Sequence, residues 1–159
     1  ESGGAAATNA TLTGTIEPGE DVSVWFGCVL RGDDAPIRVG ARTNIQDLTM
    51  IHADVDVPNV IGEEVTIGHR CVLHGAQVGD RCLIGMGAIV MDDCVVGEGC
   101  IVAAGSVVTQ GKKLAPGTLW AGVPAKEIGP VPERLRKGEI ERIANNYQKY
   151  SSWYKADAE

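Results

Sequence analysis

The sequence has few aromatic residues and no long apolar segment. Its 159 residues include one Phe, three Trp and three Tyr, but 21 Gly. Large globular cores rely on aromatic side chains that bury about 150–250 Å² each, so this composition favours a thin core of small and aliphatic side chains. No run reaches the roughly 18 apolar residues that a transmembrane helix needs, and we therefore expect no membrane association.

An excess of positive charge is also missing. The chain has 14 Lys and Arg against 21 Asp and Glu, which gives a formal net charge of -7. Nucleic-acid-binding proteins gather Lys and Arg on one face to hold phosphates, so we do not expect nucleic acid as a partner. The length fits a single domain.

A six-residue repeat runs through most of the chain. An aliphatic residue recurs every six positions, is usually followed by Gly or another small or acidic residue, and has a small residue four positions later. Two repeats are irregular: four extra residues lie between Ile51 and Ile61, and the repeat that begins at Leu73 is one residue short. A period of six fits neither a helix nor a heptad, but it suits a parallel β-helix with three repeats per coil. We therefore predict an all-β solenoid over residues 1–128. The repeats that bear on the site begin at Leu30, Val39, Ile45, Ile51, Ile61, Ile67, Leu73 and Val78.

All five cysteines fall on the small position of the repeat, which points into the core. We interpret them as core-filling residues rather than as disulfide, redox or metal-binding groups. Free thiols favour a reducing compartment, so a cytoplasmic location is expected. They are Cys28, Cys71, Cys82, Cys94 and Cys100.

A helical pattern replaces the repeat near the C-terminus. After a Pro-containing linker that reaches Pro132, apolar residues recur at three-, four- and five-residue steps. This pattern predicts an amphipathic helix within residues 129–159, lying on the outside of the solenoid or covering its end. Its apolar stripe consists of Leu135, Ile140, Ile143, Tyr147, Tyr150 and Tyr154.

The repeat register places two of the only three histidines in one column. Because three repeats close one coil, Ile51 and Leu73 stack on the same face of successive coils. His52 and His74 follow these residues directly and form a column with Arg31. Coils lie about 4.8 Å apart, and side-chain rotation can bring two imidazole nitrogens to the roughly 3.3 Å that a shared zinc ion requires. His52 and His74 can therefore share a metal.

The third histidine lies on a different face. His69 follows Ile67 by two positions, stacks over Asp47 and points away from the His52 column. A solenoid of this kind has no interior room for a ligand, so a site that uses all three histidines needs His69 from a neighbouring subunit. Rotation by a third of a turn closes such a contact and predicts a homotrimer with three sites. Three imidazoles with an open fourth position are typical of catalytic zinc, although iron or cobalt also fits them. The alternative is that these histidines are solvated surface groups.

Several motifs resemble those of the γ-class carbonic anhydrases over nearly the whole chain. The resemblance implies a left-handed β-helix trimer, with zinc bound by His52 and His74 of one subunit and His69 of the next. It also implies reversible hydration of carbon dioxide to bicarbonate by water that zinc activates. The motifs are Leu30-Arg31-Gly32-Asp33, Thr43-Asn44-Ile45-Gln46-Asp47, Ile51-His52, Ile67-Gly68-His69 and Leu73-His74-Gly75.

The resemblance implies roles for the residues around the histidines. Arg31 and Asp33 would form an ion pair near the subunit interface, and Asp47 would pair with Arg31 across it. A purely architectural role for these three residues is the alternative. Gln46 and Asn44 would orient the water and the substrate.

Further candidate residues would lie near the metal or between it and solvent. Tyr147 resembles a tyrosine that reaches the site in some members of the family, although packing within the helix stripe is the alternative. Asp34, or Asp54 or Asp56 in an inserted loop from Ala53 to Asn59, could carry protons to solvent. The resemblance implies that such a short loop goes with weak hydration activity, so zinc binding is the firmer expectation.

Two other functions fit the same pattern. Hexapeptide repeats also occur in acyltransferases, and the segment from Trp120 to Lys126 is similar to one found in those enzymes. A hexapeptide acyltransferase, or a relative that handles coenzyme A thioesters, would use one interfacial histidine as a base and no metal. A trimeric metal-binding scaffold without catalytic activity is the other alternative.

Overall fold

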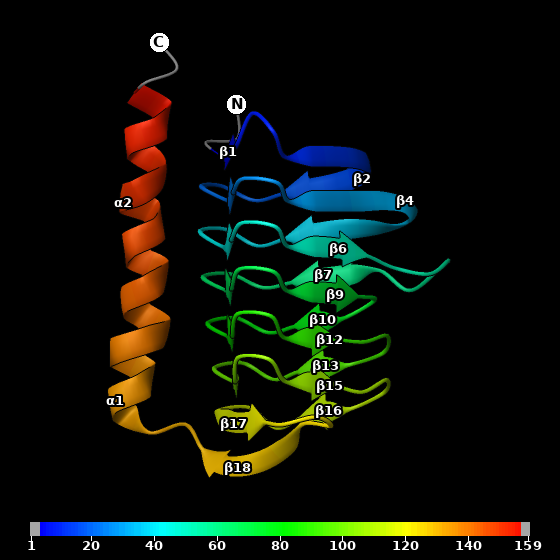
Figure 1. Cartoon of the computed structure of the whole chain (residues 1–159), viewed down its shortest axis with the longest axis vertical. Coiled ribbons are helices and arrows are strands. Elements are labelled where there is room, and N and C mark those ends of the chain that lie inside the picture. Colours follow the sequence, from blue (N-terminus) through cyan, green and yellow to red (C-terminus); the bar gives the residue numbers. More distant parts are fainter. Residues whose placement is uncertain (1–3, 157–159) are drawn as a thin grey trace.

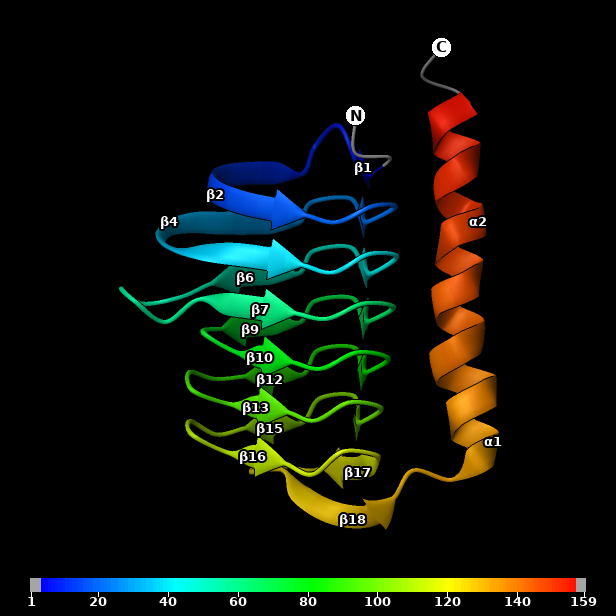
Figure 2. The ribbon, with the colours of Figure 1, turned by 180° about the vertical axis from the view of Figure 1, so that it is seen from behind.

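The computed structural model describes residues 4–156, with side chains up to residue 153, and shows a solenoid flanked by one helical rod (Figure 1). Short strands stack from the N-terminal end of the solenoid to its C-terminal end, and the rod runs back along one side. The view from behind shows the same stacking of coils (Figure 2). The predicted all-β solenoid with a C-terminal helix is therefore confirmed.

The first face of the solenoid is a parallel sheet that ends in one antiparallel strand. The last strand pairs antiparallel with its neighbour and closes the C-terminal end. It extends two residues beyond the expected boundary at residue 128. In spatial order the strands are β1 (Ala5–Ala6), β3 (Ser23–Val24), β5 (Asn44–Ile45), β8 (Thr66–Ile67), β11 (Leu83–Ile84), β14 (Ile101–Val102), β17 (Thr118–Ala121) and β18 (Lys126–Pro130).

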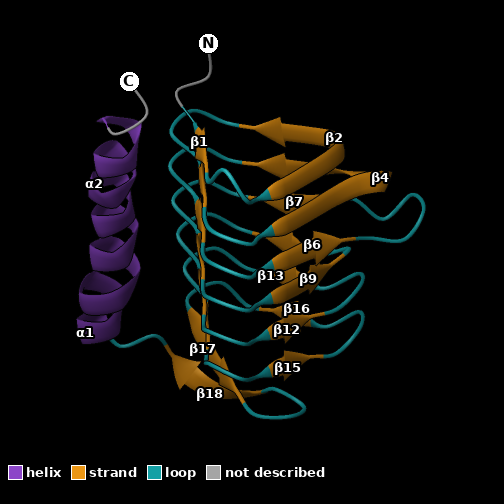
Figure 3. Ribbon diagram, turned by 45° about the horizontal axis from the view of Figure 1, so that its top comes forward, coloured by secondary structure: helices purple, strands orange, loops and turns teal. Residues whose placement is uncertain are grey.

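The other two faces belong to one sheet that bends along the long strand β4 (Val29–Val39) (Figure 3). Strand β2 (Thr11–Pro18) pairs with both halves of β4. The second face contains the first half of β4, β6 (Met50–His52), β9 (Val72–His74), β12 (Ile89–Val90) and β15 (Val107–Val108). The third face contains the second half of β4, β7 (Asn59–Ile61), β10 (Gln77–Val78), β13 (Val95–Val96) and β16 (Lys113–Leu114).

The pairing register confirms that three repeats close one coil. On the second face Ile51 pairs with Leu30 on one side and with Leu73 on the other. His52 lies opposite His74 in the same ladder. Side chains alternate between the two faces of a strand, so burial of the aliphatic residue turns the histidine after it outward.

The core consists of the inward aliphatic residue of each repeat and the small residue at each corner. These side chains are almost fully buried, and each coil gains its stability by stacking on the next. The aliphatic members include Leu30, Ile45, Ile51, Ile61, Ile67, Leu73, Ile84, Val90, Val96 and Val102.

The five cysteines are part of this core, as predicted. All are free and fully buried. Burial raises the pKa of the Cys71 thiol to about 11 and that of Cys82 to about 12. Since the thiolate is the reactive form, both should be inert in the folded protein.

We expect an aromatic disulfide reagent to label the native protein very slowly at pH 8. The reaction of Cys71 and Cys82 should be about 100-fold or more slower than that of an ordinary thiol. All five thiols should react at once after denaturation, and absorbance of the released thiol measures both rates. Rapid labelling of Cys71 or Cys82 in the native protein would contradict the core assignment.

The insertion between β6 and β7 is anchored at the histidine column. Asn59, which the spacing assigned to the inserted loop, is instead the first residue of β7 and is fully buried. Its Nδ2 donates to the carbonyl of His52 at 2.9 Å, and its Oδ1 accepts the amide of Ala76 at 3.0 Å. The loop therefore covers residues 53–58, and its end is fixed beside His52.

The C-terminal rod packs along the first face rather than over the end of the solenoid (Figures 1 and 2). It consists of α1 (Glu133–Leu135), a π-helical segment η1 (Arg136–Glu141) and α2 (Arg142–Ala156). Ile140 and Ala144 are buried against the solenoid, whereas the side chain of Tyr154 lies outside the described residues. No helix in the described part of the chain has the length and apolarity to span a bilayer.

Candidate metal centre

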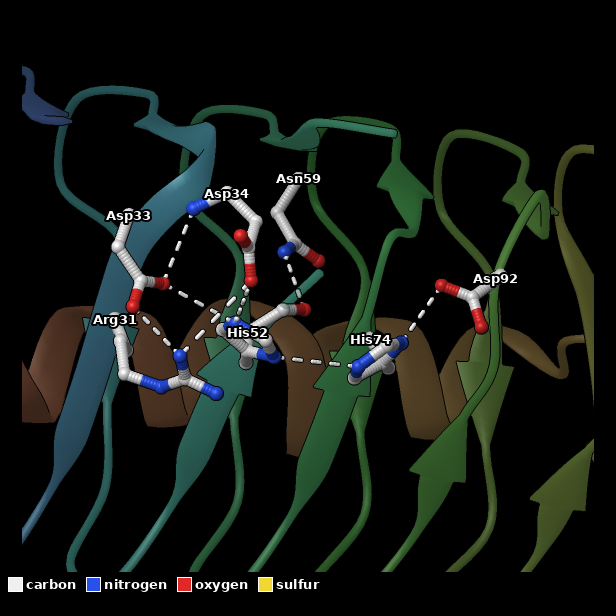
Figure 4. Close-up of polar contacts among 7 residues, drawn as sticks. All are labelled: Arg31, Asp33, Asp34, His52, Asn59, His74 and Asp92. Atoms are coloured by element: carbon white, nitrogen blue, oxygen red, sulfur yellow. Dashed lines mark hydrogen bonds and ion pairs between the residues drawn. The ribbon is translucent and has the colours of Figure 1, made fainter. Parts of the chain in front are cut away.

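His52 and His74 lie side by side on the second face, at the ends of β6 and β9 (Figure 4). Nδ1 of His52 is 3.3 Å from Nε2 of His74. Two imidazole nitrogens that each bind one ion at about 2.0 Å have this separation in a tetrahedral site. His52 points outward but is only 8% exposed, because neighbouring side chains such as His74 and Asp33 cover its ring. The pair is shaped to hold a divalent cation between the rings.

The other nitrogen of each ring faces a carboxylate. Nε2 of His52 is 3.2 Å from Oδ1 of Asp33 and 3.2 Å from Oδ2 of Asp34. Nδ1 of His74 is 2.7 Å from Oδ1 of Asp92. A carboxylate only accepts, so each ring places its N–H there and turns the lone pair of its other nitrogen toward the second ring. Two facing lone pairs need a cation or a proton between them, and this donor set therefore fits a metal ion.

Arg31 holds the carboxylates beside His52. Its Nη1 donates to Oδ2 of Asp33 at 2.6 Å and lies 4.0 Å from Oδ2 of Asp34. This hydrogen bond is the main reason that the pKa of the Asp33 carboxyl lies below its ordinary value. Asp33, Asp34 and His52 are close enough together to form a small cation site of their own. The Arg31 guanidinium already balances the negative charge of these carboxylates. They are therefore better suited to orienting His52 than to binding a cation of their own.

His69 lies at the corner between the first and second faces, in a different part of the coil. Its Nδ1 is 2.8 Å from Oδ2 of Asp47, and its Nε2 is 3.5 Å from the hydroxyl of Tyr147 on α2. Burial, followed by the charge of Asp47, raises the pKa of Tyr147 to about 12. The phenol therefore stays protonated and can donate to Nε2. The chain does not bring His69 to the pair formed by His52 and His74.

Two buried amides lie behind His69. Gln46 is 4% exposed and its Nε2 donates to Oδ1 of Asn44 at 3.1 Å. Asn44 is fully buried and its Nδ2 donates to Oγ1 of Thr66 at 2.9 Å. Gln46 lines a groove of about 370 Å³ between the first face and the rod, together with His69 and Tyr147. Asn44 holds Gln46 in place and does not line this groove.

The structure separates the predicted site residues into two groups. Arg31, Asp33, Asp34, His52 and His74 lie at one edge of the second face. Asp47 and His69 lie at the corner toward the first face, next to Asn44 and Gln46 at strand β5 and Tyr147 on α2. Asp54 and Asp56 are exposed on the inserted loop.

Asp92 was not among the site residues predicted from the sequence. It lies two positions after Val90, which stacks on Leu73 in the next coil. An acidic residue one coil beyond His74 was therefore the signal that could have revealed it.

Known proteins match this chain both in its six-residue repeat and in the family that its motifs resemble. A family model described as bacterial transferase hexapeptide matches residues 75–110, and one described as hexapeptide repeat of succinyl-transferase matches residues 58–91. A protein named carbonic anhydrase from Geobacillus kaustophilus is 45% identical over 150 residues, which cover 94% of this chain and 82% of that protein. Gamma carbonic anhydrase 3, mitochondrial, from Arabidopsis thaliana is 54% identical over 142 residues, which cover 86% of this chain and 55% of that protein.

A solved structure shows the same fold. A hexapeptide transferase family protein from Anaplasma phagocytophilum superposes with a TM-score of 0.84 at 40% identity, covering 94% of this chain and 91% of the other. This likeness and the matched repeats identify the solenoid as a left-handed β-helix. The names of these relatives point to two chemistries, carbon dioxide hydration and acyl transfer.

Proposed function

Since this chain belongs to the γ-class carbonic anhydrase family, we propose that it is a zinc-dependent enzyme that reversibly hydrates carbon dioxide to bicarbonate. The pair of His52 and His74 carries the proposal, because their facing nitrogens are 3.3 Å apart and each ring is oriented by a carboxylate. Bound zinc supplies a Lewis acid that yields a nucleophile from water near neutral pH. His69 of a neighbouring copy is the third ligand.

The outer surface of the second face supports a trimer. Its strands present a column of apolar side chains outward, and Ile89 is 37% exposed in the single chain. The other residues of the column are partly exposed, and a contiguous apolar patch on a protein surface is typical of an interface. The two edges of this face carry the two halves of the site, so a ring of three copies brings each His69 to the next pair of histidines. The column consists of Val29, Met50, Val72, Ile89 and Val107.

The remaining residues of the site divide the tasks of binding and proton transfer. The buried amide of Gln46 is held by Asn44 at the groove and can orient a water molecule or the substrate. Tyr147 keeps its proton and supports the position of His69. Asp34 lies 3.2 Å from Nε2 of His52 and its side chain is 44% exposed, so its carboxylate can pass protons to solvent.

The direct test is metal content together with carbon dioxide hydration measured by stopped flow. We expect one zinc ion per chain in protein purified without chelator. In the His69→Ala variant, zinc affinity should fall by more than the 10–100-fold that loss of an outer hydrogen-bond partner costs, and hydration should be lost. Lys113→Ala, on the third face, should match the wild type. Loading with iron(II) or cobalt would identify the metal that supports the higher rate.

One observation favours a second function. His69 lines a mostly apolar groove and is paired with Asp47 at 2.8 Å, an arrangement that suits a general base for acyl transfer. Calorimetry with acetyl-coenzyme A tests this alternative. A metal-free trimer that binds acetyl-coenzyme A would replace the carbonic anhydrase proposal. A zinc-loaded trimer without hydration activity would instead favour a non-catalytic scaffold.

A further inference from the structure

Asp92 belongs to none of the motifs that identified the site, yet its carboxylate contacts the ring of His74 (Figure 4). Its Oδ1 is 2.7 Å from Nδ1 of His74. We propose that Asp92 is a positioning residue, which fixes His74 in the tautomer that can bind the metal. This proposal rests on the zinc function proposed above.

The backbone of Asp92 is held between two coils. The amide of Gly111 donates to the carbonyl of Asp92 at 2.9 Å, and the amide of Asp93 donates to the carbonyl of Gly75 at 3.0 Å. The side chain of Asp92 is 18% exposed. The carboxylate is therefore placed by the fold and lies mostly out of solvent, where a charged hydrogen bond is stronger than in water.

Gly75 makes room for the carboxylate. A Cβ atom at this position would lie 2.5 Å from Oδ1 of Asp92 and 2.7 Å from Cγ1 of Val57. Its φ of +60° also favours glycine. The Gly after His74 is thus required for Asp92 to reach the ring, and His74, Gly75 and Asp92 form one unit that spans two coils.

The chemical effect of Asp92 is on the proton of the His74 ring. A neutral imidazole carries its proton on only one nitrogen, and the hydrogen bond of that nitrogen selects the tautomer. Asp92 accepts from Nδ1, which leaves the lone pair on Nε2, the atom that faces His52. Without Asp92 the proton is free to occupy Nε2, where it competes with the metal and weakens binding.

His74 depends on this single partner. In the part of the chain that the structure describes, His52 has two carboxylates in reach, Asp33 and Asp34, but Nδ1 of His74 has only Asp92. Loss of one carboxylate beside His52 leaves the other in place. Loss of Asp92 leaves that nitrogen without a protein acceptor among the described residues.

The experiment compares Asp92→Ala and Asp92→Asn with Asp93→Asn, a control one residue away. Zinc affinity is measured by competition with a chelator, and we expect Asp92→Ala to weaken it about 10–100-fold. Asp92→Asn should have a smaller effect because its amide oxygen can still accept. Asp93→Asn should match the wild type, since asparagine tolerates the positive φ of 59° found there.

A second measurement needs no metal. Long-range ¹H–¹⁵N spectra of the metal-free protein report which ring nitrogen of each histidine is protonated, and only three histidines need assignment. We expect His74 to be protonated on Nδ1 in the wild type and to shift toward Nε2 in Asp92→Ala. A merely structural role would not move this signal.

The two measurements distinguish a failure of the proposed role of Asp92 from a failure of the proposed zinc function. If the wild type binds zinc and Asp92→Ala binds it equally well with the same His74 tautomer, the role of Asp92 is overturned. If the wild type binds no zinc, the proposed function fails, and the tautomer spectra alone decide whether Asp92 controls the ring. Should Asp92→Ala fail to form a folded trimer, Asp92→Asn provides the comparison.

Discussion

Mixing His52→Ala chains with His69→Ala chains is expected to restore carbon dioxide hydration that neither variant shows alone. Each variant loses a different half of the site, because His52 and His69 lie at opposite edges of the second face. A trimer that contains both variants has an interface where an intact pair of His52 and His74 meets an intact His69. Random re-association in equal amounts should produce about one intact site in four and a corresponding share of wild-type activity.

The control for this experiment is a mixture of His52→Ala with His74→Ala. Both residues belong to the same half of the site, on neighbouring strands of one chain. No arrangement of these two variants rebuilds a full ligand set, and the mixture should stay inactive. Unfolding and refolding the chains together allows exchange, and stopped flow measures the recovered activity. Recovery in the control, or none in the first mixture, would contradict a site shared between subunits.

Gly40→Ala is expected to destabilise the protein by about 3 kcal/mol, at the upper end of the usual cost of overpacking. Gly40 lies at a corner where successive coils touch. A Cβ there would be 2.5 Å from the carbonyl carbon of Gly62 and 2.6 Å from the amide of Glu63. Backbone atoms cannot rotate away, and the ladder hydrogen bonds fix the spacing of the coils.

Urea denaturation at a fixed protein concentration measures the effect, since the stability of the proposed trimer would depend on concentration. Gly138→Ala is the matched control. Nothing lies within 4 Å of a Cβ at Gly138, so this change in the helical rod should be neutral or stabilise by about 0.5–1 kcal/mol. Equal stabilities for the two variants would show that the coils can move apart at the corner.

The coil register was predictable from the sequence because the repeat encodes contacts between neighbouring coils. Three repeats counted from Ile51, with the insertion before Ile61 allowed for, place Ile51 against Leu73. The column of His52 and His74 followed from this register. Handedness did not, since the same spacing suits either hand, and only the resemblance indicated it.

Features outside the repeat were harder to predict. The first strands, β1 and β2, have no regular six-residue spacing, although they extend the sheets. The contact between Tyr147 and His69 joins residues 78 positions apart, and the helical pattern alone left open whether the rod covers the side or the end. The Asp92 contact was not predicted because Met91, rather than Asp92, holds the position that corresponds to His74 in the next coil.

The rod along the first face changes how the solenoid can come apart. In a simple repeat array each coil touches only its neighbours, so the terminal coils can fray one at a time. Here the rod starts beside the last coil and reaches the first ones, where Nε2 of Gln148 donates to the carbonyls of Asp21 and Arg42 at 3.1 Å each. Opening the N-terminal coils therefore also detaches a helix anchored at the opposite end. The rod therefore couples unfolding of the first coils to unfolding of the last, and the solenoid should unfold in a single cooperative step.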